Sequence, residues 1–225
     1  MRTTNRTHTT CCAVAAWLLL LACPLGAVEI PCRPIEVAFF DLGDTLIELD
    51  PISGLFVLRA GAADLIDDLQ ALGTLLGIIT NTPPDWTRKD LEAAMATPEF
   101  LDEFEVVLLS SEANSPPKPD PAIFAEAHGL LNSPHPIDRA AFVTETLGEI
   151  ANTEDNPTLG ARAAGMVGIH LSSAAPSPLA EYTVHPDQLG DIVPIVALGL
   201  LFCDCFESGD TAAWSATVPP LGPRK

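Results

Sequence analysis

Short apolar runs alternate with segments of helical periodicity along the middle of this 225-residue chain, and that alternation limits the folds it can adopt. The apolar runs predict buried strands at 35–41, 75–81, 106–110, 140–144 and 167–171, with an edge strand at 182–184. The helical pattern predicts helices at 62–72, 86–104, 121–131, 158–165 and 188–201, the second of them interrupted by Pro98. Strands that alternate with helices predict an α/β fold: a Rossmann-like parallel sheet between two helical layers, α/β/α.

A turn sequence interrupts this alternation after the first predicted strand. Residues 46–58 contain Pro51-Ile52-Ser53-Gly54 between two arms of alternating apolar residues. This pattern predicts a β-hairpin that stands as a flap over the end of the first strand.

The first residues have the composition of an export segment. Arg2 and Arg6 precede an apolar core at 13–22 that is too short to span a bilayer comfortably. Residues 1–27 are therefore predicted to be a signal peptide cleaved near Ala27. Lipidation at Cys23 and an uncleaved membrane anchor are the alternatives. The expected location is outside the cytoplasm, periplasmic or secreted, with a membrane tether if the segment is lipidated.

The remaining boundaries follow from composition. Residues 28–202 form the predicted catalytic domain, and the Gly-, Pro- and Ser-rich residues 203–225 are predicted to be a disordered tail. In an oxidising compartment, Cys32 could form a disulfide with either Cys203 or Cys205.

The charge of the chain excludes one class of partner. It has 30 acidic and 11 basic residues and a formal net charge of −19. A nucleic-acid partner is not expected, because binding to nucleic acid needs clustered Lys and Arg. A small anion remains compatible with one or two local cations and main-chain amides.

Polar side chains follow four of the predicted strands. They are Asp41, the pair Thr80 and Asn81, Lys118 in the loop after the third strand, and the pair Thr144 and Glu145. Ligands bind beyond the carboxyl ends of parallel strands in open α/β sheets. A carboxylate can attack phosphorus, hydroxyl and amide groups can hold phosphoryl oxygens, a lysine can neutralise charge, and a second carboxylate can hold Mg²⁺.

In this order, over residues 35–197, the motifs resemble those of the haloacid dehalogenase superfamily of aspartate-nucleophile hydrolases. The motifs are Phe40-Asp41-Leu42-Gly43-Asp44-Thr45-Leu46, Ile78-Ile79-Thr80-Asn81, Pro117-Lys118-Pro119-Asp120-Pro121 and Phe142-Val143-Thr144-Glu145. The resemblance implies that Asp41 is the nucleophile and Lys118 the catalytic lysine. It further implies that Thr80, Asn81 and Lys118 bind the substrate, and that Asp41, the Gly43 carbonyl and Glu145 hold Mg²⁺.

The chain departs from the superfamily pattern at two places. Gly43 stands where its phosphatases usually carry a second Asp that acts as general acid and base, and Asp44 follows one residue later. Glu145 stands where an Asp is expected, and either Glu149 or Asp155 is the candidate for a further metal acid. The short spacing between motifs leaves no room for a large cap domain.

The leading hypothesis is an exported, Mg²⁺-dependent phosphatase that acts on a phosphomonoester, either a phosphorylated small molecule or a phosphoprotein. The two departures favour an alternative, a catalytically impaired binding protein with the same fold. A haloacid dehalogenase is a third and less favoured hypothesis, since no cap would enclose a small haloacid.

Overall fold

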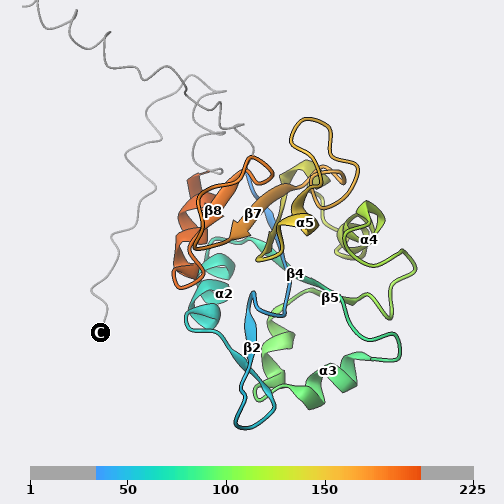
Figure 1. Ribbon diagram of the computed structural model, residues 1–225, viewed down its shortest axis with the longest axis vertical. Coiled ribbons are helices and arrows are strands. Elements are labelled where there is room, and N and C mark those ends of the chain that lie inside the picture. The colour runs from blue at the N-terminus through green and yellow to red at the C-terminus, as the bar shows by residue number, and fades with distance from the viewer. Residues whose placement is uncertain (1–33, 199–225) are drawn as a thin grey trace, which may run out of the picture. The chain divides into compact units, whose positions relative to one another are not determined.

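One parallel sheet organises the chain in the computed structural model, which describes residues 34–198 (Figure 1). Its strand order is β5-β4-β1-β6-β7-β8, and every neighbouring pair is parallel. The strands are β1 (Val37–Phe40), β4 (Leu75–Thr80), β5 (Val106–Leu109), β6 (Ala140–Thr144), β7 (Val167–Leu171) and β8 (Tyr182–Val184). All six predicted strands are confirmed, with β8 at the edge as expected.

Helices cover both faces of the sheet, so the predicted three-layer architecture is confirmed. Strand β1 is buried along its whole length, and its side chains alternate between the two cores. Ala38 and Phe40 pack in the core that contains α2 (Ala62–Ala71), whereas Val37 and Phe39 pack in the core that contains α4 (Pro121–Leu130). Burial on both faces explains why the strands are continuous apolar runs in the sequence.

Local signals set the ends of the helices. Helix α4 begins with Pro121 in its first turn, and the Asp120 side chain accepts a hydrogen bond from the Ala122 N–H. Helix α3 (Arg88–Ala94) ends before Pro98, where the 3₁₀ helix η1 (Pro98–Glu103) begins. The predicted interruption of the second helix is therefore confirmed.

The predicted hairpin is also confirmed. Strands β2 (Ile47–Leu49) and β3 (Phe56–Leu58) pair antiparallel, and the Asp50 carboxylate accepts hydrogen bonds from the main-chain N–H groups of two residues in the turn. The Phe56 carbonyl accepts a hydrogen bond from the Ala96 N–H, which joins the hairpin to the segment after α3. In Figure 1 the hairpin projects at the carboxyl edge of the sheet.

The expectation of a helix at 158–165 is wrong. Turns with hydrogen bonds between residues three apart occupy 160–165, and a short helix, α5 (Leu147–Ile150), lies earlier in the chain. Gly160 has a φ of +87° and packs directly on the Ile150 main chain, where a side chain would collide. This close approach of two backbones requires a turn instead of a continuous helix.

The last predicted helix begins with the 3₁₀ turn η3 (Leu189–Asp191) and continues as α-helix from Ile192 to the end of the described residues. The predicted signal segment 1–27, the tail 203–225, and Cys32, Cys203 and Cys205 lie outside those residues. Within 34–198, no helix combines the length and the apolar character that a bilayer crossing requires.

Candidate active site

The predicted site residues converge because their strands are neighbours. Strand β1 lies between β4 and β6, so Asp41, which follows β1, stands beside Thr80 at the end of β4 and Thr144 at the end of β6. The Asp41 N–H donates to the Val143 carbonyl at 2.9 Å, which extends the β1–β6 pairing to the nucleophile position. The carboxyl edge of the sheet thus gathers side chains from three separate segments of the chain.

A buried lysine links two carboxylates at this edge. Lys118 Nζ lies 2.5 Å from Asp41 Oδ1 and 2.9 Å from Glu149 Oε2, and the Lys118 side chain is only 1% exposed. Its ammonium group also lies 5.2 Å from the centre of the Phe142 ring. A buried ammonium needs such partners, and here it neutralises charge at the point where Asp41 would meet an anionic group.

Thr45 links the nucleophile position to the second carboxylate of the motif set. Its buried hydroxyl lies 2.7 Å from Glu145 Oε2 and 3.5 Å from Asp41 Oδ2. The Glu145 N–H in turn lies 3.4 Å from Thr45 Oγ1. A single hydroxyl therefore fixes the loop after β1 against the loop after β6.

Glu145 accepts hydrogen bonds at both carboxylate oxygens. Thr146 Oγ1 donates to Oε1 at 2.6 Å, and Thr144 Oγ1 lies 3.4 Å from Oε2, in addition to the bond from Thr45. Burial alone would raise the pKa of Glu145, but the hydrogen bonds from the Thr146 and Thr45 hydroxyls and the charge of Lys118 outweigh it and hold the pKa below its ordinary value. Glu145 is thus prepared as an anionic oxygen ligand.

For Asp41, burial outweighs the groups that lower the pKa. Burial raises its pKa from 3.8 to about 6, against the lowering effect of Lys118 and with further raising by Glu149 and Glu145. Oδ1 is bound by Lys118, whereas Oδ2 accepts only the long bond from Thr45. Asp41 is therefore ionised above about pH 6, with one oxygen largely free to react.

The other two predicted substrate-binding residues have different environments. The Thr80 side chain is buried and makes no hydrogen bond within the described part of the chain, so its hydroxyl is available to a ligand. The Asn81 amide instead exchanges two hydrogen bonds with the main chain of Lys118, each 3.1 Å long. Asn81 thereby positions the lysine loop.

Glu126 on α4 holds the same loop from its other side. Its carboxylate accepts hydrogen bonds from the N–H and side chain of Asn114 and from the N–H and hydroxyl of Ser115. These donors, the Asn114 N–H foremost, lower the pKa of Glu126 from 4.5 to about 2. The loop that delivers Lys118 is therefore secured at both ends.

The position two residues after Asp41 presents no functional side chain. Gly43 has no neighbouring atom within 4 Å of where a Cβ would lie. Asp44 is exposed, adopts a left-handed φ of 55°, and its carbonyl accepts a hydrogen bond from Arg59. Between residues 34 and 198, no hydrogen bond or ion pair joins the Asp44 side chain to Asp41 or Lys118.

The residues at this edge fit a hard divalent cation. Asp41, Glu145 and the Gly43 carbonyl supply only oxygen donors, which Mg²⁺ prefers. The described residues contain no cluster of three or more His, Cys, Asp or Glu side chains arranged as a ready metal cage. Two carboxylates and one carbonyl suit Mg²⁺, which is usually held by one or two carboxylates together with water and phosphate.

Sequence patterns did not identify Thr45 and Glu126 as site residues, and they left Glu149 and Asp155 as equal candidates. The structure brings Glu149 to Lys118 through α5, while Asp155 is exposed and makes no hydrogen bond or ion pair with a site residue. Thr45 and Glu145 are 100 positions apart, so only the fold brings them together. The sole local signal for Thr45 is a hydroxyl directly after the turn that follows Asp41.

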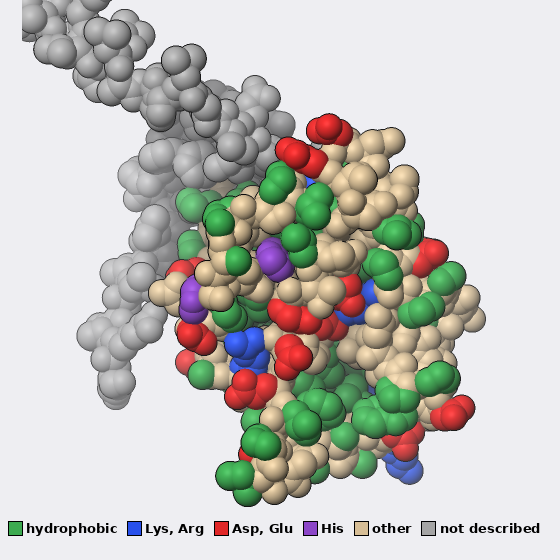
Figure 2. Space-filling model, viewed as in Figure 1, with side chains coloured by type: hydrophobic (Ala, Val, Ile, Leu, Met, Phe, Trp, Pro, Cys, Tyr) green, Lys and Arg blue, Asp and Glu red, His purple; other side chains and the backbone are tan. Residues whose placement is uncertain are grey.

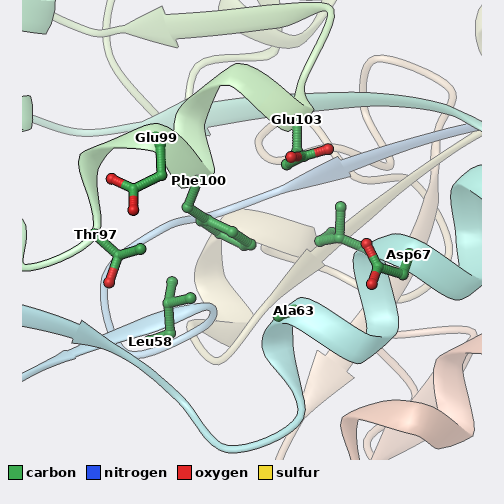
Figure 3. Close-up of a pocket in the computed structure, with 8 residues that line it drawn as sticks. Leu58, Ala63, Asp67, Thr97, Glu99, Phe100 and Glu103 are labelled. Carbon is green, nitrogen blue, oxygen red and sulfur yellow. The ribbon is translucent and has the colours of Figure 1, made fainter.

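A cavity of about 200 Å³ lies elsewhere, between β3, α2 and η1 (Figure 3). Phe100 points from η1 toward α2, and Asp67, Glu99 and Glu103 surround it. The cavity shares no residue with the carboxyl-edge site and contains no lysine, hydroxyl and carboxylate in the combination found there. Figure 2 shows acidic side chains near the middle of the face, above a hollow bordered by hydrophobic side chains.

Solved structures with similar folds were found by comparison. A HAD-superfamily hydrolase from Ehrlichia chaffeensis superposes with a TM-score of 0.55 at 16% identity, over 75% of this chain and 98% of the other. The corresponding values for a putative beta-phosphoglucomutase from Thermotoga maritima are 0.56 and 13%, over 72% and 99%. This chain has the haloacid dehalogenase fold.

The L-2-haloacid dehalogenase RSc1362 is similar to the same degree, with a TM-score of 0.56 at 14% identity, over 73% of this chain and 100% of the other. No protein-family model matches the sequence, and no curated protein matches it. The haloacid dehalogenase fold thus carries different named activities among these neighbours, so the chemistry of this chain must be argued from its own residues.

Proposed function

We propose that this protein is a phosphatase that transfers a phosphoryl group to Asp41 and then to water. The contact that carries the proposal is Lys118 Nζ between Asp41 and Glu149, within one cluster that Thr45 extends to Glu145. A nucleophile, a buried cation and a further carboxylate at one sheet edge are the groups that phosphoryl transfer through an aspartyl intermediate requires.

The first step follows from how the Asp41 carboxylate is held. Lys118 holds Oδ1, and Oδ2 accepts only the long hydrogen bond from Thr45. Oδ2 forms a bond to phosphorus while the bond from phosphorus to the leaving oxygen breaks. The raised pKa of Asp41 leaves it ionised at neutral pH and makes it more basic than an ordinary carboxylate, which favours attack.

Several groups hold the charge of the phosphoryl oxygens. The Lys118 ammonium comes from the loop between β5 and α4 and contacts Asp41 directly. The Thr80 hydroxyl, which has no hydrogen-bond partner among residues 34–198, lies at the end of β4, the strand beside β1. The main-chain N–H groups of Leu42 and Gly43 donate no hydrogen bond to the described residues and are available as well. We propose that Asp41, the Gly43 carbonyl and Glu145 bind Mg²⁺, which when bound neutralises negative charge between protein and phosphate.

The proposed substrate is a phosphomonoester of a small molecule or a phosphoprotein. We further propose that the chain is exported by its first 27 residues, to the periplasm or the exterior, with a lipid tether at Cys23 as the alternative to cleavage near Ala27. The composition of that segment supports this part of the proposal.

Hydrolysis of p-nitrophenyl phosphate with and without Mg²⁺ tests the proposal. The wild-type protein should release p-nitrophenol in a Mg²⁺-dependent manner, and Asp41→Asn should reduce the rate to background. Asp44→Asn is the matched control, because it removes a neighbouring carboxylate that contacts no site residue, and it should retain the wild-type rate. Equal rates for wild type and Asp41→Asn would refute the proposal.

The open space at Gly43 favours one second candidate, a binding protein with the same fold and impaired turnover. Under that hypothesis, Gly43→Asp should raise activity from background. Rapid Mg²⁺-dependent turnover by the wild type on any phosphomonoester would exclude it. Halide release from a 2-haloacid without added metal would instead support the third hypothesis, a dehalogenase.

A further inference from the structure

We infer that this site takes phosphoryl donors whose leaving group departs without being protonated, namely aryl and acyl phosphates, and that phosphate stays on Asp41 long enough to accumulate. The inference rests on the proposed function and narrows its substrate class. It concerns the departure of the leaving group, whereas the contacts of Asp41 and Lys118 concern the attack on phosphorus.

The chemistry of the leaving group sets the requirement. When Asp41 Oδ2 bonds to phosphorus, the electron pair of the breaking P–O bond goes to the leaving oxygen. An alkoxide is strongly basic, so alkyl phosphates need a proton from a positioned acid, which contributes about 10²- to 10⁴-fold in rate. A phenolate or carboxylate delocalises the charge and leaves without that help.

Residue 43, two positions after Asp41, offers no acid that could supply this proton. The Cβ direction of Gly43 opens onto empty space, and the residue itself has no side chain. Asp44, the next residue, is exposed, and its left-handed backbone and the Arg59 bond to its carbonyl fix the turn in that form. Neither residue supplies a proton donor to the cluster.

The remaining polar groups of the cluster have other partners. Both oxygens of Glu145 accept hydrogen bonds from hydroxyls, and Glu149 Oε2 accepts from Lys118 and from Thr144 at 3.1 Å. The Lys118 ammonium lies between Asp41 and Glu149. His170 Nε2 lies 3.0 Å from the Glu145 carbonyl, while Nδ1 has no hydrogen-bond partner among the described residues. When Nε2 carries the proton that this carbonyl accepts, Nδ1 of the neutral ring has none to give. The two glutamates and the lysine are already engaged in positioning or charge neutralisation.

The lack of an acid–base side chain at residue 43 also affects the second step, the hydrolysis of the aspartyl-phosphate. Water attacks phosphorus, a new P–O bond forms, and the Asp41–phosphorus bond breaks with its electron pair returning to the carboxylate. A base at the position of Gly43 would take the proton of that water, but here the proton passes to solvent or to the phosphate itself. Hydrolysis of the aspartyl-phosphate is slowed for this reason, and the phosphorylated protein accumulates.

A leaving-group series tests the inference. Rates are measured with Mg²⁺ on acetyl, p-nitrophenyl, phenyl and ethyl phosphate for the wild type and for Gly43→Asp. Gly43→Ala is the matched control, since it adds a Cβ and the same backbone restriction without a carboxyl. Space around the Gly43 Cβ position accommodates both substitutions, and the φ of Gly43 is not in the left-handed region.

The wild type should lose activity steeply from p-nitrophenyl to ethyl phosphate. Gly43→Asp should raise the rate on ethyl phosphate by about 10²- to 10⁴-fold and the rate on p-nitrophenyl phosphate far less. Gly43→Ala should keep the wild-type ratio between these two rates, whatever its absolute rate. Acid quenching during turnover should trap phosphate on the wild-type protein, and less of it on Gly43→Asp.

Three results would overturn the inference. One is a wild-type rate on ethyl phosphate equal to that on p-nitrophenyl phosphate. The second is a loss of about 10²-fold or more in Asp44→Asn, which would assign the acid to Asp44. The third is the absence of both turnover and trapped phosphate with every substrate. Only this third result would also overturn the proposed function.

Discussion

Replacing Asp41 with Asn is expected to stabilise the folded protein at neutral pH while it abolishes activity. Burial raises the pKa of Asp41 from 3.8 to about 6, despite the nearby Lys118 ammonium. One pKa unit corresponds to about 1.4 kcal/mol, so the ionised carboxylate destabilises the folded state by about 3 kcal/mol relative to the unfolded chain. Asn has nearly the shape of the protonated acid and carries no charge to be buried.

The sign of the pH dependence follows from the same shift. The folded protein binds the Asp41 proton more tightly than the unfolded chain does, so wild-type stability falls as pH rises from 3.8 to about 6 and levels off above. The variant lacks this titration. The two proteins should therefore have similar free energies of unfolding near pH 4 and differ by about 3 kcal/mol at pH 8.

Urea denaturation between pH 4 and pH 8, in EDTA and followed by tryptophan fluorescence, measures the difference. Asp44→Asn is the control, because its carboxylate is exposed, and it should show no such pH-dependent gain. If Asp41→Asn is no more stable than the wild type at pH 8, the attraction of Lys118 outweighs burial and the reasoning is wrong.

Three further perturbations have definite expected outcomes. Thr45→Val removes the hydroxyl between the two carboxylates and should lower kcat/KM for p-nitrophenyl phosphate at least tenfold, with Thr45→Ser close to wild type. Glu126→Gln should lower the thermal midpoint at pH 7 by the equivalent of about 1 kcal/mol, and the difference should vanish as pH falls from 4.5 toward about 2, where the wild-type carboxylate is protonated. Gly77→Ala should destabilise by about 1–3 kcal/mol in urea, because its Cβ would collide with the Phe39 ring, whereas Gly129→Ala in open space on α4 should be neutral or stabilising.

The sheet was predictable from the sequence because its strands are buried on both faces. Each strand is then a continuous apolar run whose ends are marked by turn residues, and the bounds of β6 and β7 agree with the prediction at both ends. The residues at 158–165 were not predictable, since the close approach of Gly160 to the Ile150 main chain is a tertiary contact. Helix α5 spans only four residues and shows no periodicity.

The candidate site also has features that were predictable from the sequence and features that were not. Asp41, Thr80 and Glu145 could be placed together because parallel strands end at one edge, and the motif around Lys118 indicated the lysine. The link through Thr45 could not be placed, because it depends on the rotamers of side chains from two loops. Sequence also gave no sign that Asn81 would turn toward the main chain of the lysine loop.

The central claim, that Asp41 is the nucleophile, is tested most directly by locating the phosphate on the protein. Acid-quenched turnover mixtures can be reduced with borohydride, which converts an aspartyl-phosphate to homoserine, and then mapped by peptide mass spectrometry. We expect the conversion at residue 41 of the wild type and at no residue of Asp41→Asn. Conversion at another aspartate, or Mg²⁺-dependent turnover with no phosphorylated residue at any stage, would contradict the assignment.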